Sequence, residues 1–378
     1  MSTNAQRVSR LVLVAGLVLL GPAAALAQIR VGQTIDLSGS TSEHGKAVLS
    51  GIRAYLDPLN AAGGIDGRRI ELITLDDGGK ADAAANNTRA LIERDKVVAV
   101  FSGIEGGPCV ASMRVAVELG VPLLACAAGS PDFRDPFNRY VFPLRAAHLT
   151  EFEAITKLAK QFGRARLAFM YSDSDTGRKH LANLKRVAQA EGAEVVAEIV
   201  LKSGADAPAA KLMAEQIVAS RAQAVLNHGA YSTYAAIYTE VRNLDPAIQF
   251  YAVNSGAQQM VRLLGPSARG IVFTQVVPFP TSVAPPVVGD YRAAMKQHAP
   301  NEELTFSSLE GYLNARLLVA ALRLAGRNPT PEGIVTALER AGRVDLGGFV
   351  VRYSPTSHDG STFVDTVFAK RDGKFIAR

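Results

Sequence analysis

Short apolar segments alternate along the chain with longer segments of helical periodicity. The run Val97-Val98-Ala99-Val100-Phe101 is apolar throughout, which is typical of a strand buried on both faces. Residues 44–59 instead repeat apolar side chains at helical spacing, with Val48 and Ile52 on one stripe. The same patterns predict further strands at 29–37, 69–75 and 121–127 and helices at 80–94 and 109–119.

A second series of strands and helices follows the first. Its strands are predicted at 167–171, 194–201, 224–227, 249–253 and 271–277, and its helices at 178–191, 209–220, 231–243 and 257–264. Further helices are predicted at 287–298, 307–326 and 331–341, and terminal antiparallel strands at 349–353 and 362–369. Because buried strands that alternate with helices form parallel sheets covered by those helices, the sequence predicts an α/β protein with two open parallel sheets.

The loops that follow the strands are the candidate binding segments. Open α/β sheets bind ligands beyond the carboxyl ends of their strands, where loops lead into helices. Two such sheets that face one another form a cleft. The predicted cleft loops are 36–45, 102–109, 127–132, 172–177, 227–231 and 254–256.

The loop at 102–109 carries the clearest binding signal, because it follows a buried strand and opens a helix. Gly106 and Gly107 let a ligand approach the backbone, Pro108 suits a first helical turn, and Cys109 begins the predicted helix. Unpaired N–H groups and the helix dipole at such a start attract a carboxylate or a phosphate. A plain glycine-rich turn is the alternative. The loop matches neither GxGxxG nor GxxxxGK[ST], which argues against nucleotide binding.

The end of the next predicted strand offers groups to the same anion. Ala127, Ala128 and Gly129 supply main-chain groups there, and Ser130 supplies a hydroxyl. A strand end made of small residues for tight packing is the alternative. The hydroxyl-rich loop at 38–43 is interpreted more simply, as a helix N-cap.

Residues 1–27 are predicted to be an export signal that is cleaved after Ala27, which implies a periplasmic protein. Arg7 and Arg10 precede an apolar run at 11–20, and small residues precede the cleavage site. That run is shorter than the about 20 residues of a spanning helix, and no later segment qualifies, so we expect no membrane insertion. The formal net charge is +6, but the basic residues form no stripe interleaved with aromatics, so nucleic acid is not an expected partner.

Catalytic and metal-binding patterns are absent from the sequence, so we predict no enzyme activity, no metal site and no cofactor. Asp76 and Asp77 end a strand and are interpreted as a turn. The six histidines lack HExxH or related spacing and are expected at surface or cap positions. Cys109 has no local basic partner that would activate it as a nucleophile. With Cys126 it forms either a disulfide or two semi-buried free thiols, and the thiols are favoured.

Several segments together resemble a known family. They include 29–39, the pattern N-x-x-G-G-I-x-G-x-x-I at 60–70, and Ser-Ser-Leu-Glu-Gly-Tyr at 307–312. After an export signal, they resemble the periplasmic solute-binding proteins of Leu/Ile/Val-type ABC importers. The resemblance implies the type I fold, in which two Rossmann-like lobes joined by three crossovers close on a small ligand. It also implies a monomer that serves an inner-membrane ABC permease.

The resemblance implies lobe boundaries and a carboxylate-binding wall. The first lobe would comprise 28–147 and 278–352, and the second 148–277 and 353–378. In the first lobe, the carboxylate-binding loops of the family fall on glycine and alanine positions, where the amino-acid binders usually carry serine. These positions are Gly106, Gly107, Ala127 and Gly129, with Ser130 adjacent.

The second-lobe positions depart from the family in charge. Thr176 falls where an aromatic often lines the wall, and Tyr231 would supply a ring from the next loop. Asn254 aligns with the acidic residue that balances a bound α-ammonium, and an amide cannot offset a desolvated cation as a carboxylate does. Glu310 is expected to pack or to form a surface salt bridge rather than to compensate a charge in the cleft, and Arg145 is expected to fix the hinge rather than to complement the anion. A carboxylate ligand, with or without an amine, is the prediction; a signalling sensor or an exported α/β enzyme are the other interpretations.

Overall fold

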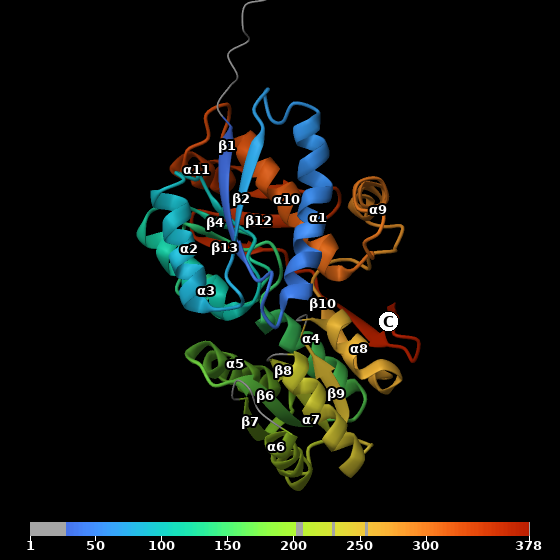
Figure 1. Ribbon diagram of the computed structural model, residues 1–378. Coiled ribbons are helices and arrows are strands. Elements are labelled where there is room, and N and C mark those ends of the chain that lie inside the picture. The colour runs from blue at the N-terminus through green and yellow to red at the C-terminus, as the bar shows by residue number, and fades with distance from the viewer. Residues whose placement is uncertain (1–27, 202–206, 229–230, 254–255, 378) are drawn as a thin grey trace, which may run out of the picture.

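The computed structural model describes residues 28–201, 207–228, 231–253 and 256–377, which form two lobes. Figure 1 shows one lobe above the other, with the first half of the sequence mainly in the upper lobe. The predicted α/β class, with two sheets that have parallel cores, is confirmed. The predicted export signal at 1–27 and the predicted ligand residue Asn254 lie outside the described residues.

The first lobe contains a parallel sheet in the order β2-β1-β3-β4-β5. Its strands are β1 (Ile29–Ile35), β2 (Ile70–Asp76), β3 (Val100–Phe101), β4 (Leu123–Leu124) and β5 (Val141–Phe142). Its helices are α1 (Ser42–Ala61), α2 (Ala81–Glu93), α3 (Gly106–Glu118), η1 (Pro131–Phe133), α9 (Pro286–His298), α10 (Phe306–Leu324) and α11 (Pro331–Ala341). A small antiparallel sheet, β11 (Arg343–Asp345), β12 (Val350–Ser354) and β13 (Ser357–Gly360), completes this lobe.

Helices α1 and α10 approach one another through two glycines. A Cβ atom on Gly51 would lie 1.8 Å from the carbonyl oxygen of Ser308, and one on Gly311 would lie 2.0 Å from that of Val48. The two backbones are therefore in direct contact, and no other residue fits at either position without displacing a helix. This contact fixes the rotation of α10, and with it the direction of the adjacent side chain of Glu310.

The second lobe contains a seven-stranded sheet in the order β15-β14-β10-β9-β8-β6-β7. Its parallel strands are β6 (Arg166–Ser172), β7 (Glu194–Leu201), β8 (Ala224–His228), β9 (Gln249–Ala252) and β10 (Val272–Gln275). Two antiparallel strands, β14 (Asp365–Ala369) and β15 (Phe375–Ala377), extend one edge. The helices are α4 (His148–Gln161), α5 (Asp175–Glu191), α6 (Ala207–Ala219), α7 (Tyr231–Leu244), α8 (Ala257–Leu264) and η2 (Gly265–Ala268).

The chain passes between the lobes between β5 and α4, between β10 and α9, and between β13 and β14. The third passage comes later than the boundary expected at 353, because β13 pairs with β12. Residues 353–360 therefore lie with the first lobe. The amide of Ser361 donates to the carbonyl oxygen of Leu144 at 2.7 Å, so the first and third passages lie side by side and form one hinge. Within the described ranges, no helix has both the length and the apolar character that crossing a membrane requires.

Candidate functional site

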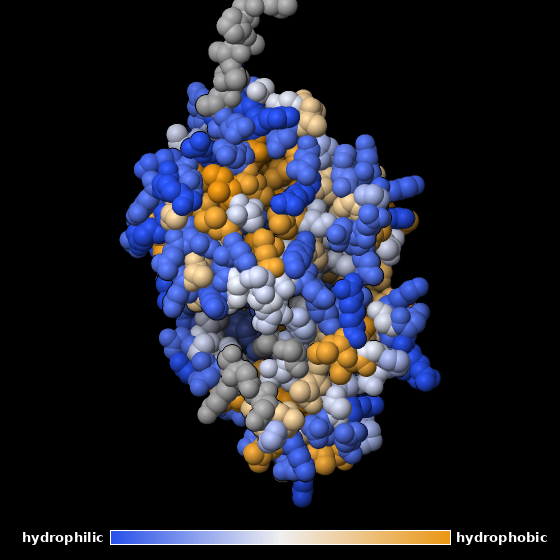
Figure 2. Space-filling view, in the orientation of Figure 1, coloured by the Kyte–Doolittle hydropathy of each residue, from blue (hydrophilic) through white to orange (hydrophobic). Residues whose placement is uncertain are grey.

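The carboxyl ends of the two sheets face one another and are in contact. The hydroxyl of Thr176, which follows β6, donates to Oδ2 of Asp132, which follows β4, at 2.8 Å. The hydroxyl of Tyr231, which follows β8, donates to the carbonyl oxygen of Ser40, which follows β1, at 3.0 Å. Figure 2 shows a hollow lined by hydrophilic residues where the lobes meet. The predicted cleft between strand-end loops is therefore present, and Thr176 and Tyr231 both reach the opposite lobe.

The first turn of α3 lies between these two contacts, because β3 is the strand between β1 and β4. The helix begins at Gly106, three residues before the predicted start at Cys109. Gly106 and Gly107 are partly or fully exposed, and a Cβ atom on either one would have no neighbour within 4 Å. Helix geometry gives their amides no partner inside the helix. These two amides are therefore open to an anion.

Pro108 and Cys109, although predicted in the same anion site, face inward. Both are buried. Pro108 has no N–H group, and the amide of Cys109 donates to the carbonyl oxygen of Glu105 at 3.2 Å as an ordinary helical bond. Their contribution is to begin the helix and anchor it, while the amides of Gly106 and Gly107 are the groups free to bind.

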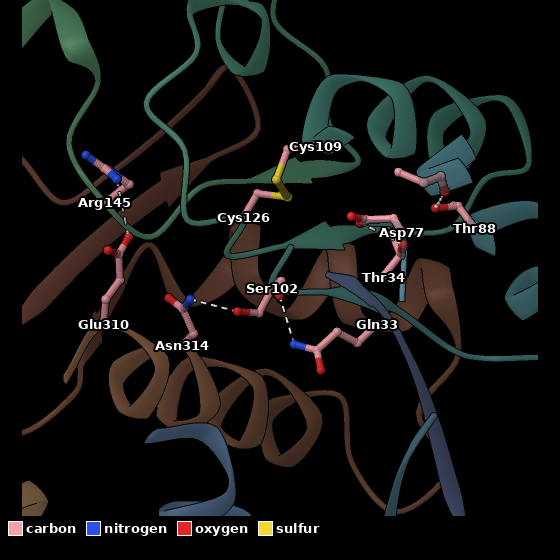
Figure 3. Close-up of a disulfide and its surroundings, with 11 residues drawn as sticks. Gln33, Thr34, Asp77, Thr88, Ser102, Cys109, Cys126, Arg145, Glu310 and Asn314 are labelled. Atoms are coloured by element: carbon pink, nitrogen blue, oxygen red, sulfur yellow. Dashed lines mark hydrogen bonds and ion pairs between the residues drawn. A yellow bond between two sulfur atoms is a disulfide. The ribbon is translucent and has the colours of Figure 1, made fainter. Parts of the chain in front are cut away.

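Cys109 and Cys126 form a disulfide, so the favoured interpretation as two free thiols is wrong (Figure 3). The residues are 17 positions apart in the sequence, but β3 and β4 are neighbouring strands and bring their Cα atoms to 6.2 Å. Closing a loop of this length stabilises a fold by about 3 kcal/mol in the chain-entropy model. The bond ties the start of α3 to the loop after β4, which are the two segments predicted to hold the anion.

The backbone before α3 is held in an unusual conformation. Ser102 has φ 45°, a left-handed value that is rare outside glycine. Its carbonyl oxygen accepts a hydrogen bond from Nε2 of Gln33 at 2.8 Å, and its hydroxyl accepts one from Nδ2 of Asn314 at 2.9 Å (Figure 3). Contacts from β1 and α10 thus fix the turn that aims the start of α3 at the cleft.

The segment Ala127–Ser130 is buried. The amide of Ala127 donates to the carbonyl oxygen of Gly103 at 2.8 Å. Gly129 lies so close to His148 that a Cβ atom would be 2.8 Å from the imidazole. The hydroxyl of Ser130 caps η1 and lies 3.0 Å from Oδ2 of Asp132. Close packing thus accounts for the small side chains of this segment, including Ala128, and its place in the anion site stays a prediction.

Asp132 is a residue that the sequence analysis did not single out. Its carboxylate accepts hydrogen bonds from Ser130 and Thr176 and forms an ion pair with Lys179 on α5. Burial disfavours the charged form, but the hydrogen bonds from Lys179, Thr176 and Ser130 outweigh it and hold the pKa of Asp132 below its usual value. Asp132 thus links the lobes as an anion.

Arg145 lies in the first passage and connects both lobes. It is 1% exposed, its Nη2 lies 2.9 Å from Oε1 of Glu151 on α4, and its Nη1 lies 3.7 Å from Oε1 of Glu310 on α10 (Figure 3 shows the Glu310 pair). Burial disfavours the charged carboxylate of Glu151, yet His148 and Arg145 hold its pKa at about 2. Arg145 thus lies where its expected hinge role requires, and Glu310 forms a buried ion pair with it rather than a surface salt bridge.

The expectation that the histidines occupy surface or cap positions is wrong for most of them. Sequence spacing did not reveal their burial, because each is brought inward by a different element. The buried ones are His44, His148, His180 and His358; His228 is half-buried and His298 is exposed.

A model of the family described as periplasmic binding protein matches residues 28–373. The chain belongs to the periplasmic binding protein family. This binding protein is 27% identical over 174 residues to the Leu/Ile/Val-binding protein homolog 7 of Brucella suis biovar 1 (strain 1330), in a match that covers 42% of each chain. The matched segment thus spans about two fifths of that curated relative.

Solved structures resemble this binding protein over most of its length. An extracellular ligand-binding receptor from Verminephrobacter eiseniae is 29% identical, with a TM-score of 0.83, and the match covers 92% of this chain and 99% of that one. A possible leucine/isoleucine/valine-binding protein from Rhodopirellula baltica is 26% identical, with a TM-score of 0.85 and coverage of 95% and 98%. The family and the fold predicted from the sequence are confirmed, and these structural neighbours are described as ligand-binding proteins.

Proposed function

We propose that this chain is the periplasmic solute-binding component of an ABC importer. It captures a small carboxylate-bearing ligand, an amino acid or an aromatic or aliphatic organic acid, by closure of the two lobes. In this proposal the export signal is removed after Ala27, and the mature chain acts as a monomer that delivers its ligand to an inner-membrane permease. The names of the Brucella suis and Rhodopirellula baltica proteins, which refer to leucine, isoleucine and valine, support an acid of this size.

The observation that carries the proposal is the exposed start of α3. The amides of Gly106 and Gly107 have no partner inside the helix and lie at the strand edge between the contacts of Thr176 and Tyr231 with the first lobe. A helix N-terminus with free amides stabilises an anion. A carboxylate bound there would be covered by Thr176 and Tyr231 when the lobes close.

A thermal-shift screen of the mature chain tests the proposal. The panel contains branched-chain and aromatic amino acids, aromatic acids and short aliphatic acids, each paired with its uncharged carboxamide. A ligand present at 100 times its Kd adds about 2.7 kcal/mol to the stability of the folded state, so a cognate acid raises Tm while its carboxamide does not. If no acid raises Tm, or if acid and carboxamide act alike, the carboxylate proposal fails.

A further inference from the structure

Three histidines from separate elements meet inside the second lobe. His148 is the first residue of α4, His180 lies on α5, and His228 ends β8. One ring nitrogen of each lies within 4.8 Å of the other two. The rings of His180 and His228 have centroids 3.7 Å apart. Three potential nitrogen ligands therefore converge on one point.

The polar atoms of this cluster lack partners. Neither ring nitrogen of His180 has a hydrogen-bond partner among the described residues, although the side chain is only 1% exposed. The same holds for Nδ1 of His228. A neutral imidazole carries one donor and one acceptor, and leaving both unpaired in the interior is unfavourable. A bound cation that accepts an electron pair from each ring would satisfy the acceptor nitrogen of each imidazole.

His148 is oriented by a carboxylate. Its Nδ1 lies 2.7 Å from Oε1 of Glu151, whose other oxygen accepts a hydrogen bond from the hydroxyl of Thr274 at 2.6 Å. A hydrogen bond from Nδ1–H to a carboxylate leaves Nε2 with its lone pair. Histidine ligands of metals are commonly fixed in this way by a carboxylate on the other nitrogen.

We propose that His148, His180 and His228 form a binding site for a divalent transition-metal ion of the Zn²⁺ class. Three imidazoles suit zinc and leave one coordination position open, whereas Ca²⁺ and Mg²⁺ prefer oxygen ligands. Zn–N bonds of about 2.0–2.1 Å place tetrahedral ligands about 3.4 Å apart.

The site adjoins the proposed ligand loops but does not depend on them. The amide of His148 donates to the carbonyl oxygen of Gly129 at 3.0 Å, and His180 lies one helical turn after Thr176. A metal titration requires no carboxylate ligand. The metal site and the carboxylate proposal can therefore fail independently of one another.

Calorimetric titration of the mature chain with Zn²⁺ tests the site. The protein is prepared without a histidine tag and freed of metal with a chelator. We expect one Zn²⁺ per chain, and a Kd at least 10-fold higher in His180→Gln and in His228→Gln. His298→Gln is the matched control, because it removes an exposed imidazole on α9, and it should bind as the wild type does. Co²⁺ should give the intense visible absorption of a tetrahedral centre.

Circular dichroism and thermal unfolding of the metal-free variants establish that they fold. Because His180 has no hydrogen-bond partner to lose among the described residues, its replacement should not unfold the lobe. If His180→Gln nevertheless fails to fold, the test is made with His228→Gln alone, since His228 is only half-buried. The proposal is overturned if the wild type takes up no Zn²⁺, or if the folded His180→Gln and His228→Gln variants match the His298→Gln control in stoichiometry and Kd.

Discussion

Replacing Gly107 by alanine separates ligand binding from folding. In the structure a Cβ atom on Gly107 has no neighbour within 4 Å, and the residue does not occupy the left-handed region. The added methyl group therefore fits without strain. Alanine is favoured over glycine in helices by roughly 0.5–1 kcal/mol. Without ligand, Gly107→Ala should be as stable as the wild type or slightly more stable.

The same methyl group stands where the carboxylate is proposed to approach the α3 amides. We expect the Kd of the acid found in the thermal-shift screen to rise at least 10-fold, which corresponds to about 1.4 kcal/mol of binding free energy. Gly289→Ala on α9 is the matched control. Its Cβ also meets nothing within 4 Å, and Figure 1 places α9 at the outer side of the first lobe, away from the α3 start.

Urea unfolding measures the stability of each variant, and calorimetric titration measures its Kd. The expected pattern is a similar stability for Gly107→Ala and Gly289→Ala, with weaker binding in Gly107→Ala alone. An unchanged Kd in Gly107→Ala would refute the assignment of the carboxylate to the α3 amides. A loss of stability confined to Gly107→Ala would show that the start of α3 is not the open space described above.

Further predictions concern the disulfide, the hinge and the second-lobe wall. The double variant Cys109→Ala/Cys126→Ala should lose about 3 kcal/mol of unfolding free energy, and a reductant should destabilise the wild type but not the variant. Because the pKa of Glu151 is about 2 in the folded protein against a reference of 4.5, its contribution to stability is complete above about pH 4.5 and declines as the pH falls toward 2; the difference in urea midpoint between the wild type and Glu151→Gln should shrink over that range. Thr176→Val should weaken ligand binding and should lower the free energy of unfolding by no more than about 1 kcal/mol. Asn254→Asp should favour amine-bearing ligands over plain acids in competition titrations. The interpretation of Asn254 is wrong if amino acids bind best to the wild type and no longer bind to this variant.

The two sheets could be predicted from the sequence because their signals are local. The apolar run at 97–101 is continuous since its strand is covered on both sides, and α1 repeats its apolar residues at helical spacing. The start of α3 was placed too late, because glycines at the beginning of a helix carry no periodic signal. The passage after β13 was also placed early, since a three-strand antiparallel unit and the edge of a large sheet have the same alternation.

Only some features of the candidate site could be predicted from the sequence, because the others depend on contacts between distant segments. The loops at Gly106, Thr176 and Tyr231 follow from the rule that ligands bind at strand ends. Nothing local distinguishes a disulfide from two thiols at Cys109 and Cys126, since the pairing depends on β3 and β4 being neighbours. The histidine cluster depends likewise on α4, α5 and β8 meeting in space.

The lobes contact one another directly through side chains of the protein itself. Among the residues that the structure describes, these contacts include Thr176 and Lys179 with Asp132, Tyr231 with Ser40, and Arg262 with Glu43 and Glu303. A hydrogen bond contributes about 1 kcal/mol and an exposed ion pair less than that, so together they stabilise closure by about 2–4 kcal/mol before the entropy of ordering is subtracted. Converting an open population of 99% into a closed one of 99% takes about 5.5 kcal/mol. The open population of the ligand-free protein already reflects these contacts, so they do not reduce this difference. A binding protein that starts mainly open must therefore draw the whole of it from ligand contacts that only the closed form makes, which are contacts with the second lobe. Thr176 and Tyr231, which already reach across the cleft, are the described residues placed to make them.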